Sequence, residues 1–154
     1  GSLNTADAQV YSTADLKAQN YKVKDGGDCS LPVYIFKNGV SVIPVYGAGL
    51  WGPVWGYVAL DGLNIVGAYF DHASETPGLG GKIKDDPKFR AQFQGKSLDF
   101  GDAQPFDIVK GGAPAGKANA IDAISGATMT SKGLSEAINV WALAYKNYLK
   151  NKED

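Results

Sequence analysis

Two pairs of β-prone runs, each joined by a turn-forming dipeptide, constrain the fold of this chain more than any other feature. The runs are residues 32–37 and 40–46 around Asn38-Gly39, and residues 57–60 and 63–70 around Asp61-Gly62. Such dipeptides favour tight hairpin turns because Gly and Asn adopt positive φ angles at low cost. Pro44 cannot donate to a strand ladder, so we expect an edge or a bulge there. The pattern predicts an antiparallel sheet built of hairpins.

The end of the chain carries the apolar stripe of a long helix. Large apolar residues recur there every three or four positions, at Leu134, Ile138, Trp141, Tyr145 and Tyr148 or Leu149. Thr130 and Ser131 are good N-cap residues for this helix. Shorter helices are expected over residues 13–19 and 86–94, a strand over 106–110 and a small-residue loop over 111–120. The predicted class is α+β, an antiparallel β-sheet with the long C-terminal helix packed on it, in a single domain spanning residues 3–154.

Composition narrows the possible functions. The 154 residues suffice for one domain that buries about 70% of the surface of its unfolded chain. The net charge is −1 and the basic residues are scattered, so nucleic acid and anionic membrane surfaces are not favoured partners. Apolar runs fall short of the roughly eighteen residues that cross a bilayer. The single cysteine, Cys29, forms no internal disulfide.

The segment Asp122-Ala-Ile-Ser-Gly-Ala-Thr-Met-Thr-Ser131 immediately precedes the helical stripe. Unpaired N–H groups and the positive end of the helix dipole meet at such a point, and the dipole alone favours a phosphate by roughly 0.3–1 kcal/mol. Gly126 and Ala127 leave room for a phosphate beside Thr128. A Ser/Thr-rich helix cap without any ligand is the alternative interpretation of this loop taken alone.

Two further segments could bind a ligand: residues 72–80, which are rich in polar side chains, and the glycine-rich residues 47–52 with their neighbouring tryptophans. In His72-Ala-Ser-Glu-Thr-Pro-Gly-Leu-Gly80, Glu75 and Thr76 precede a rigid turn and can offer an acceptor, a hydroxyl and backbone groups to a heterocycle. A solvated loop is the alternative. Residues 47–52 satisfy Gly-x-Gly-x-x-Gly, but Pro53 and the following strand leave no helix for a pyrophosphate, which argues against a dinucleotide site. Trp51 and Trp55 are interpreted as core or contact aromatics.

Hydrolytic and zinc chemistry are not favoured. Ser125, His72 and Asp122 could be imagined as a triad, but the sequence around Ser125 is not a Gly-x-Ser-x-Gly elbow. His72 is the only histidine, which excludes a His-rich zinc site. A lone imidazole is more often a structural hydrogen-bonding group than a catalyst.

Three segments, in one order along the chain, resemble a known family. Residues 122–128 resemble the Asp-Gly-x-Ser-Gly-Ala-Thr pattern of FMN-binding domains, with Ala123 in place of the frequent Gly. Residues 72–80 resemble the His-x-x-Glu-Thr-Pro-Gly-Leu-Gly loop of the singly anchored FMN-binding subunit of the sodium-pumping NADH:quinone oxidoreductase, which we call the flavin subunit. The stretch Tyr46-Gly-Ala-Gly-Leu-Trp51 resembles the Gly-x-Gly-Leu-Trp segment of the same protein. Its counterpart in the ion-pumping ferredoxin:NAD oxidoreductase, where a Gly-Gly stretch without Leu-Trp is expected, is the related alternative.

The resemblance implies a covalent flavin. FMN would be esterified through its phosphate to Thr128 by a separate magnesium-dependent flavin transferase that uses FAD. The implied surroundings of the cofactor are Ser125, Gly126, Ala127, Glu75, Thr76, Gly78, Leu79, Gly80, Lys110 and Trp51. For Lys110, an exposed surface lysine is the alternative, and for Leu79 a core position.

The resemblance also implies an electron relay between an iron centre and the next flavin of a bacterial inner-membrane complex, on its periplasmic side. The flavin subunit has one N-terminal membrane helix, and Gly1-Ser2 is typical of the remnant of a cleaved tag, so we expect that anchor to have been removed. Without an export signal, FMN is expected to be absent from protein made in a cytoplasm lacking the transferase. The second function class is a docking or assembly module that never carries flavin and uses Trp51, Trp55 and the Pro77 loop.

Overall fold

The structure is a computed structural model that describes residues 11–26 and 29–153. Gly1 and Ser2, on which the expectation of a removed tag rests, lie outside the described residues. No helix among the described residues is long and apolar enough to cross a membrane. The architecture is α+β, as predicted, with an antiparallel sheet and a long helix near the C-terminus.

The four-stranded sheet is a meander in the order β1-β2-β3-β4, in which each strand pairs with its sequence neighbour. The strands are β1 (Tyr34–Ile35), β2 (Ser41–Ala48), β3 (Pro53–Asp61) and β4 (Asn64–His72). Both predicted hairpins are present, and positive φ falls on Gly39 at 85° and on Gly62 at 61°. In the described part of the chain, β1 reaches only to Val42, so Pro44 lies where β2 has a single neighbour. Pro44 therefore occupies the edge position expected for it.

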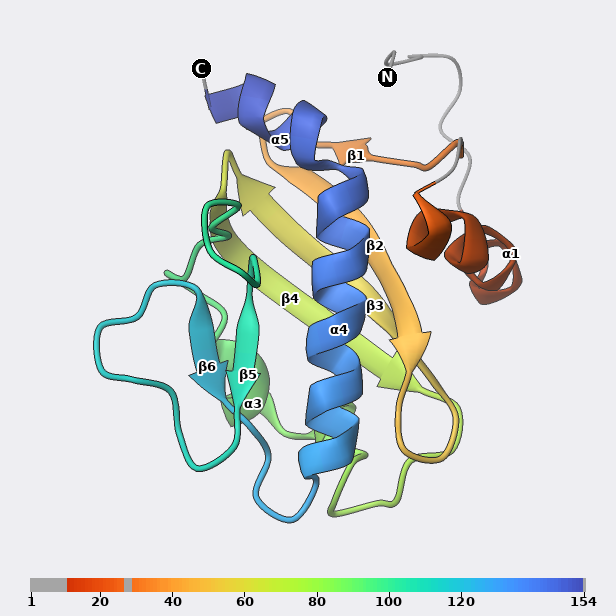
Figure 1. The fold of residues 1–154 in the computed structure, drawn as a ribbon, viewed down its shortest axis with the longest axis vertical. Coiled ribbons are helices and arrows are strands. Elements are labelled where there is room, and N and C mark those ends of the chain that lie inside the picture. The colour runs from red at the N-terminus through yellow and green to blue at the C-terminus, as the bar shows by residue number, and fades with distance from the viewer. Residues whose placement is uncertain (1–10, 27–28, 154) are drawn as a thin grey trace.

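The long helix α4 (Thr128–Ala144) crosses one face of this sheet (Figure 1). The helix α1 (Thr13–Asp25) lies on one side of it, and the short parallel pair of β5 (Asp107–Val109) and β6 (Ala120–Asp122) lies on the other. Two short helices, α2 (Lys82–Asp85) and α3 (Pro87–Ala91), follow β4, and α5 (Lys146–Glu153) follows α4. The predicted stripe of α4 and α5 is buried from Leu134 through Leu149.

Several boundaries differ from the sequence-based expectations. The long helix begins at Thr128, so Thr130 and Ser131 lie inside its first turn and are not its caps. The helix expected over residues 13–19 continues to Asp25, where Gly26 ends it at a φ of 69°. The loop expected over residues 111–120 ends in the parallel strand β6. This strand spans only three residues, so no periodic pattern in the sequence could predict it.

A stack of phenylalanines fixes the loop-rich middle of the chain to the sheet. The Phe93 ring lies 5.1 Å from that of Phe70 on β4 and 5.2 Å from that of Phe106, measured between centroids. Phe89 on α3 meets the same ring edge-on at 5.7 Å. All four rings are buried. They hold α3 against β4 and β5 against α4.

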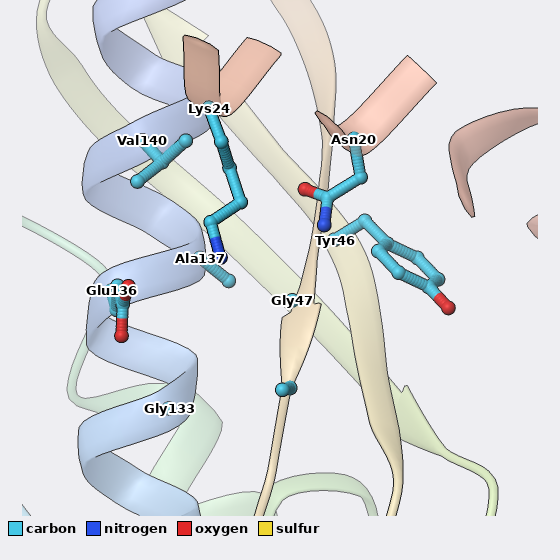
Figure 2. Close-up of a pocket in the computed structure, with 9 residues that line it drawn as sticks. Asn20, Lys24, Tyr46, Gly47, Gly133, Glu136, Ala137 and Val140 are labelled. Carbon is cyan, nitrogen blue, oxygen red and sulfur yellow. The ribbon is translucent and has the colours of Figure 1, made fainter. Parts of the chain in front are cut away.

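Two glycines let α4 approach β2 closely, as Figure 2 shows for Gly47 and Ala137. A Cβ atom added at Gly47 would lie 2.7 Å from Cβ of Ala137. A Cβ atom added at Gly133 would collide with the backbone carbonyl oxygen of Ala48. The helix thus packs backbone to backbone on this edge of the sheet, which sets the position of its first turn.

We expect Gly133→Ala to destabilise the domain although alanine is the better helix former by about 0.8–1.0 kcal/mol. The added methyl group meets backbone that cannot move without shifting β2, and such overpacking typically costs about 1–3 kcal/mol. Because the collision is with backbone, we expect a cost toward the upper end of that range, so urea unfolding should show a net loss of about 1–2 kcal/mol after the gain in helix propensity is subtracted. Gly67→Ala is the matched control, since an added Cβ there has open space within 4 Å. A more stable Gly133→Ala protein would contradict this close packing.

Candidate functional site

The first turn of α4 has no side-chain cap. Ala127 occupies the N-cap position with φ −134° and ψ 45°, and no side chain bonds to the exposed helix end. Alanine is among the least favoured N-cap residues because it has no acceptor for the first N–H groups. Among the described residues, no protein acceptor receives the backbone N–H of Thr128, Met129 or Thr130. The positive end of the dipole and these donors together favour an anion.

Ser131 holds the loop that leads into this helix, from inside the first turn. Its Oγ donates to the carbonyl oxygen of Ala127 at 2.9 Å and accepts the N–H of Ile124 at 3.1 Å. The N–H of Ala127 donates to the carbonyl oxygen of Ile124 at 3.0 Å. Ser125 and Gly126 project from this loop and are exposed, with Gly126 at a φ of 79°. The loop is therefore fixed even though the helix end is open.

Thr128 is half-buried, and the helical repeat places it on the β5 side of the helix. Residues seven and eleven positions apart share a helix face, which places Thr128 with Ser135 and Asn139. Those two side chains contact Phe106, just before β5: Ser135 Oγ donates to its carbonyl oxygen at 3.4 Å, and Asn139 Oδ1 accepts its N–H at 2.7 Å. The Thr128 hydroxyl makes no hydrogen bond to any described residue.

Lys110 follows β5 on this same side. It is exposed, and among the described residues it has no carboxylate partner. The neighbouring backbone lies against the loop that precedes Thr128, because the N–H of Ala123 donates to the carbonyl oxygen of Val109 at 3.0 Å. The N–H of Ala113 donates to Oδ1 of Asp122 at 2.7 Å. Lys110 is thus a cation near the loop that precedes Thr128, without a direct contact to Thr128.

Residues 75–80 lie against the other side of the first turn, although about fifty residues separate them from it. Thr130 Oγ1 donates to Oε1 of Glu75 at 2.6 Å. A Cβ atom at Gly80 would lie 3.2 Å from Cβ of Thr130, and a Cβ atom at Gly126 would lie 3.4 Å from Cδ2 of Leu79. The two loops and the helix start therefore form one continuous surface.

The turn within residues 75–80 is closed by Thr76. Its carbonyl oxygen accepts the N–H groups of Leu79 at 3.1 Å and Gly81 at 2.9 Å, around Gly78 at a φ of 77°. Thr76, Gly78 and Leu79 are exposed, whereas Glu75 and Gly80 are buried. The loop thus presents a hydroxyl and an aliphatic side chain outward.

Glu75 is 3% exposed and ionised at neutral pH. Desolvation by burial raises the pKa of this carboxyl, but hydrogen bonds from Thr130 and from the backbone of Trp51 and Leu50, with the nearby His72, outweigh it and leave the pKa below its usual value. The backbone N–H of Leu50 donates to Oε1 at 2.7 Å and that of Trp51 donates to Oε2 at 2.8 Å. This carboxylate therefore connects the β2–β3 turn to the first turn of α4 by hydrogen bonds.

Four large apolar side chains around the helix start are exposed, and we call them the apolar rim. They are Leu50 at 49%, Trp51 at 66%, Leu79 at 45% and Met129 at 57% exposure. Exposed apolar side chains gathered at one place mark a surface that binds a ligand or a partner. Leu50, Met129 and Thr130 were not assigned to the site from the sequence. Thr130 could have been found as the core-facing position four residues before Leu134.

A separate small hollow lies between α1, β2 and α4 (Figure 2). It is lined by Asn20, Lys24, Tyr46, Gly47, Ala48, Gly133, Glu136, Ala137 and Val140. Its lining faces the β2 side of α4, whereas Thr128 faces the β5 side. The β2–β3 turn, which contains the dinucleotide-like glycines, runs directly into β3 at Pro53, so no helix follows it. Neither feature competes with the helix start as the candidate site.

Comparison with known proteins gives consistent results. The FMN-binding domain family matches residues 49–142. A subunit of the Na(+)-translocating NADH-quinone reductase of Vibrio anguillarum is 42% identical over 116 residues, which cover 71% of this chain and 45% of that protein. The equivalent protein from Yersinia pestis is 46% identical over 104 residues, covering 65% of this chain and 38% of that protein. The chain thus spans less than half the length of these relatives.

Two solved structures share the fold. The crystal structure of the same reductase subunit from Parabacteroides distasonis is 39% identical with a TM-score of 0.69, covering 77% of this chain and 62% of that one. The crystal structure of NqrC from Shewanella oneidensis is 34% identical with a TM-score of 0.65, covering 77% and 59%. These similarities confirm the resemblance to the flavin subunit. Because the matched residues 49–142 make up more than half of the chain and contain the whole of residues 122–131, the chain belongs to the family of FMN-binding domains.

Proposed function

We propose that this domain carries FMN as a phosphoester on Thr128 and relays electrons within a sodium-translocating NADH:quinone oxidoreductase. The observation that carries the proposal is the uncapped start of α4. There a free hydroxyl, three free backbone N–H groups and the dipole's positive end coincide in an FMN-binding domain. A phosphate is the group that satisfies all of them together.

The attachment reaction is consistent with these groups. A separate flavin transferase would join Thr128 Oγ to the FMN phosphorus of FAD, while the pyrophosphate bond breaks and AMP leaves. The threonine proton passes to a base of the transferase, since the described residues offer the hydroxyl no acceptor. The free N–H groups would then bind the phosphate oxygens, and Lys110 would lie close enough to reduce its negative charge.

Other residues of the site would orient the ring. Thr76, Gly78, Leu79 and Gly80 would form one wall, and Trp51 another, with Ser125, Gly126 and Ala127 around the phosphate. FMN supplies the electron-transfer chemistry when bound. The protein supplies a fixed position and an environment that sets the ring's potential. Covalent attachment keeps the cofactor in place where free FMN is scarce.

The larger assembly is part of the same proposal. The similarity to the flavin subunit supports partners among the other proteins of that oxidoreductase. We place the domain on the periplasmic side of a bacterial inner membrane, as the resemblance implies. An N-terminal membrane helix would anchor the whole protein. The counterpart in the ferredoxin:NAD oxidoreductase is the related alternative, which the relatives named above do not favour.

A second candidate function is that of a docking module without flavin. The apolar rim is the observation that favours it, since the same four side chains would suit a protein partner. Flavin content separates the two functions. A domain that the transferase cannot label would leave docking as the better interpretation.

We expect Thr128 alone to be modified when the domain is incubated with the transferase, FAD and magnesium. Intact mass should rise by the mass of FMN less one water, and peptide mapping should place the adduct on Thr128. Thr128→Ala should abolish labelling because the nucleophilic hydroxyl is lost. Thr128→Ser, which keeps the hydroxyl, should still label, and Ser125→Ala is the control within the same loop. An adduct on Ser125 or Thr130 would contradict the assignment.

We expect Thr76→Ala to shift the flavin reduction potential without preventing attachment. The Thr76 side chain is exposed on the loop beside the helix start, and a hydrogen bond from its hydroxyl to the ring would contribute about 0.5–1.5 kcal/mol. A redox titration of the labelled protein measures the shift, and Thr76→Ser should restore the original potential. Equal potentials for all three proteins would show that Thr76 does not contact the ring.

A further inference from the structure

Glu75 is the one charged side chain that is buried in the part of the chain the structure describes. Burying a carboxylate is costly unless hydrogen bonds replace its hydration. Here three donors do so: the Thr130 hydroxyl and the consecutive N–H groups of Leu50 and Trp51. The donors come from two segments that are not otherwise joined by a hydrogen bond among the described residues. One carboxylate therefore connects the β2–β3 turn to the first turn of α4.

Two glycines make room for this connection. A Cβ atom at Gly49 would collide with the carboxylate of Glu75, and one at Gly80 would lie 3.1 Å from Cβ of Glu75. Neither glycine has a positive φ, so each position is constrained by space and not by backbone conformation. Gly49 in the turn and Gly80 in the loop of residues 75–80 thus leave the space that the Glu75 side chain occupies.

The other ties of the β2–β3 turn are weaker. Gly49 N–H donates to the carbonyl oxygen of Gly52 within the turn itself at 2.8 Å, and the exposed Ser74 Oγ donates to the Trp51 carbonyl at 3.1 Å. The first tie does not fix the turn to the rest of the molecule, and the second competes with water. The bonds to Glu75 are charge-assisted and their acceptor is a buried carboxylate, which makes them the stronger ones.

We propose that Glu75 is a positioning residue, whose carboxylate fastens the Leu50–Trp51 turn to the start of α4 and so fixes the position of Trp51, which would form one wall of the flavin site. Most acceptor sites of this carboxylate are already occupied, so it acts through the turn and does not present its oxygens to the flavin. The role of Trp51 as a wall of the flavin site rests on the proposed function. The connection between the two segments does not, and it can be tested in protein without flavin.

The first test is amide hydrogen exchange of the flavin-free domain, measured residue by residue by NMR. Glu75→Gln leaves one acceptor oxygen and turns an N–H₂ group toward a backbone donor, so Leu50 and Trp51 amides should exchange at least about tenfold faster. Thr130→Val, which removes only the hydroxyl donor, should speed exchange at the start of α4 and serves if Glu75→Gln does not fold. Ser74→Ala is the matched control and should leave these amides unchanged.

A glycine variant tests the same connection from the other partner. Gly49→Ala is allowed by its backbone conformation and should displace the carboxylate, so it should reproduce the faster exchange of Glu75→Gln. Gly67→Ala is its control. Wild-type exchange rates at Leu50 and Trp51 in both Glu75→Gln and Gly49→Ala would overturn the connection.

The second test uses domain labelled with FMN. Glu75→Gln should still be labelled on Thr128, because the acceptor faces the opposite side of the helix. Its flavin fluorescence should increase severalfold toward that of Trp51→Phe, since a nearby indole quenches flavin emission, and Ser74→Ala should match wild type. Equal emission in wild type, Trp51→Phe and Glu75→Gln would overturn the wall. Failure of wild type to be labelled at all would overturn the proposed function, while amide exchange would still decide the role of Glu75.

Discussion

The close approach of α4 to β2 is the constraint on which the rest of the structure depends. Gly47 and Gly133 remove the side chains that would otherwise separate helix from sheet, and the helix backbone rests almost against Ala48. This contact lies five residues into α4, so it fixes the height of the helix start above the sheet. The β2–β3 turn, which follows Ala48 directly, is thereby placed next to that start.

The site is assembled from three segments that are distant in sequence: the β2–β3 turn, the loop of residues 75–80 and the start of α4. The loop of residues 75–80 reaches α4 because β4 ends beside the β2–β3 turn, where His72 Nδ1 also accepts the N–H of Glu75 at 3.1 Å. Buried hydrogen bonds of Ser131 and Glu75 then hold the two loops against the first turn of α4. What remains unsatisfied is the helix end itself. The groups around the helix start are hydrogen-bonded, whereas three backbone N–H groups at the helix start are free. This contrast is typical of a site that binds an anion and not of a defect in the fold.

Sequence reasoning found what short patterns encode. Asn38-Gly39 and Asp61-Gly62 identified both hairpins, and the stripe from Leu134 to Leu149 identified the helix, because turn chemistry and periodicity are local. The helix start was misplaced because Thr130 and Ser131 look like caps, whereas their hydroxyls serve Glu75 and the Ala127 carbonyl. The strand β5 was expected, but its parallel partner β6 could not be predicted, since three residues are too few to show a periodic pattern. Which side of α4 each loop contacts is likewise a tertiary property.

The arrangement also resolves an electrostatic conflict. A buried carboxylate at 3% exposure and a phosphate would repel each other if they shared one face of the same helix end. Thr128 and Thr130 point to opposite sides of α4, and a helix with its side chains is about 10–12 Å across. Glu75 therefore bonds the core-facing hydroxyl, while the phosphate would lie on the side of Lys110. Both anions gain from the same positive helix end, and the helix itself keeps them apart.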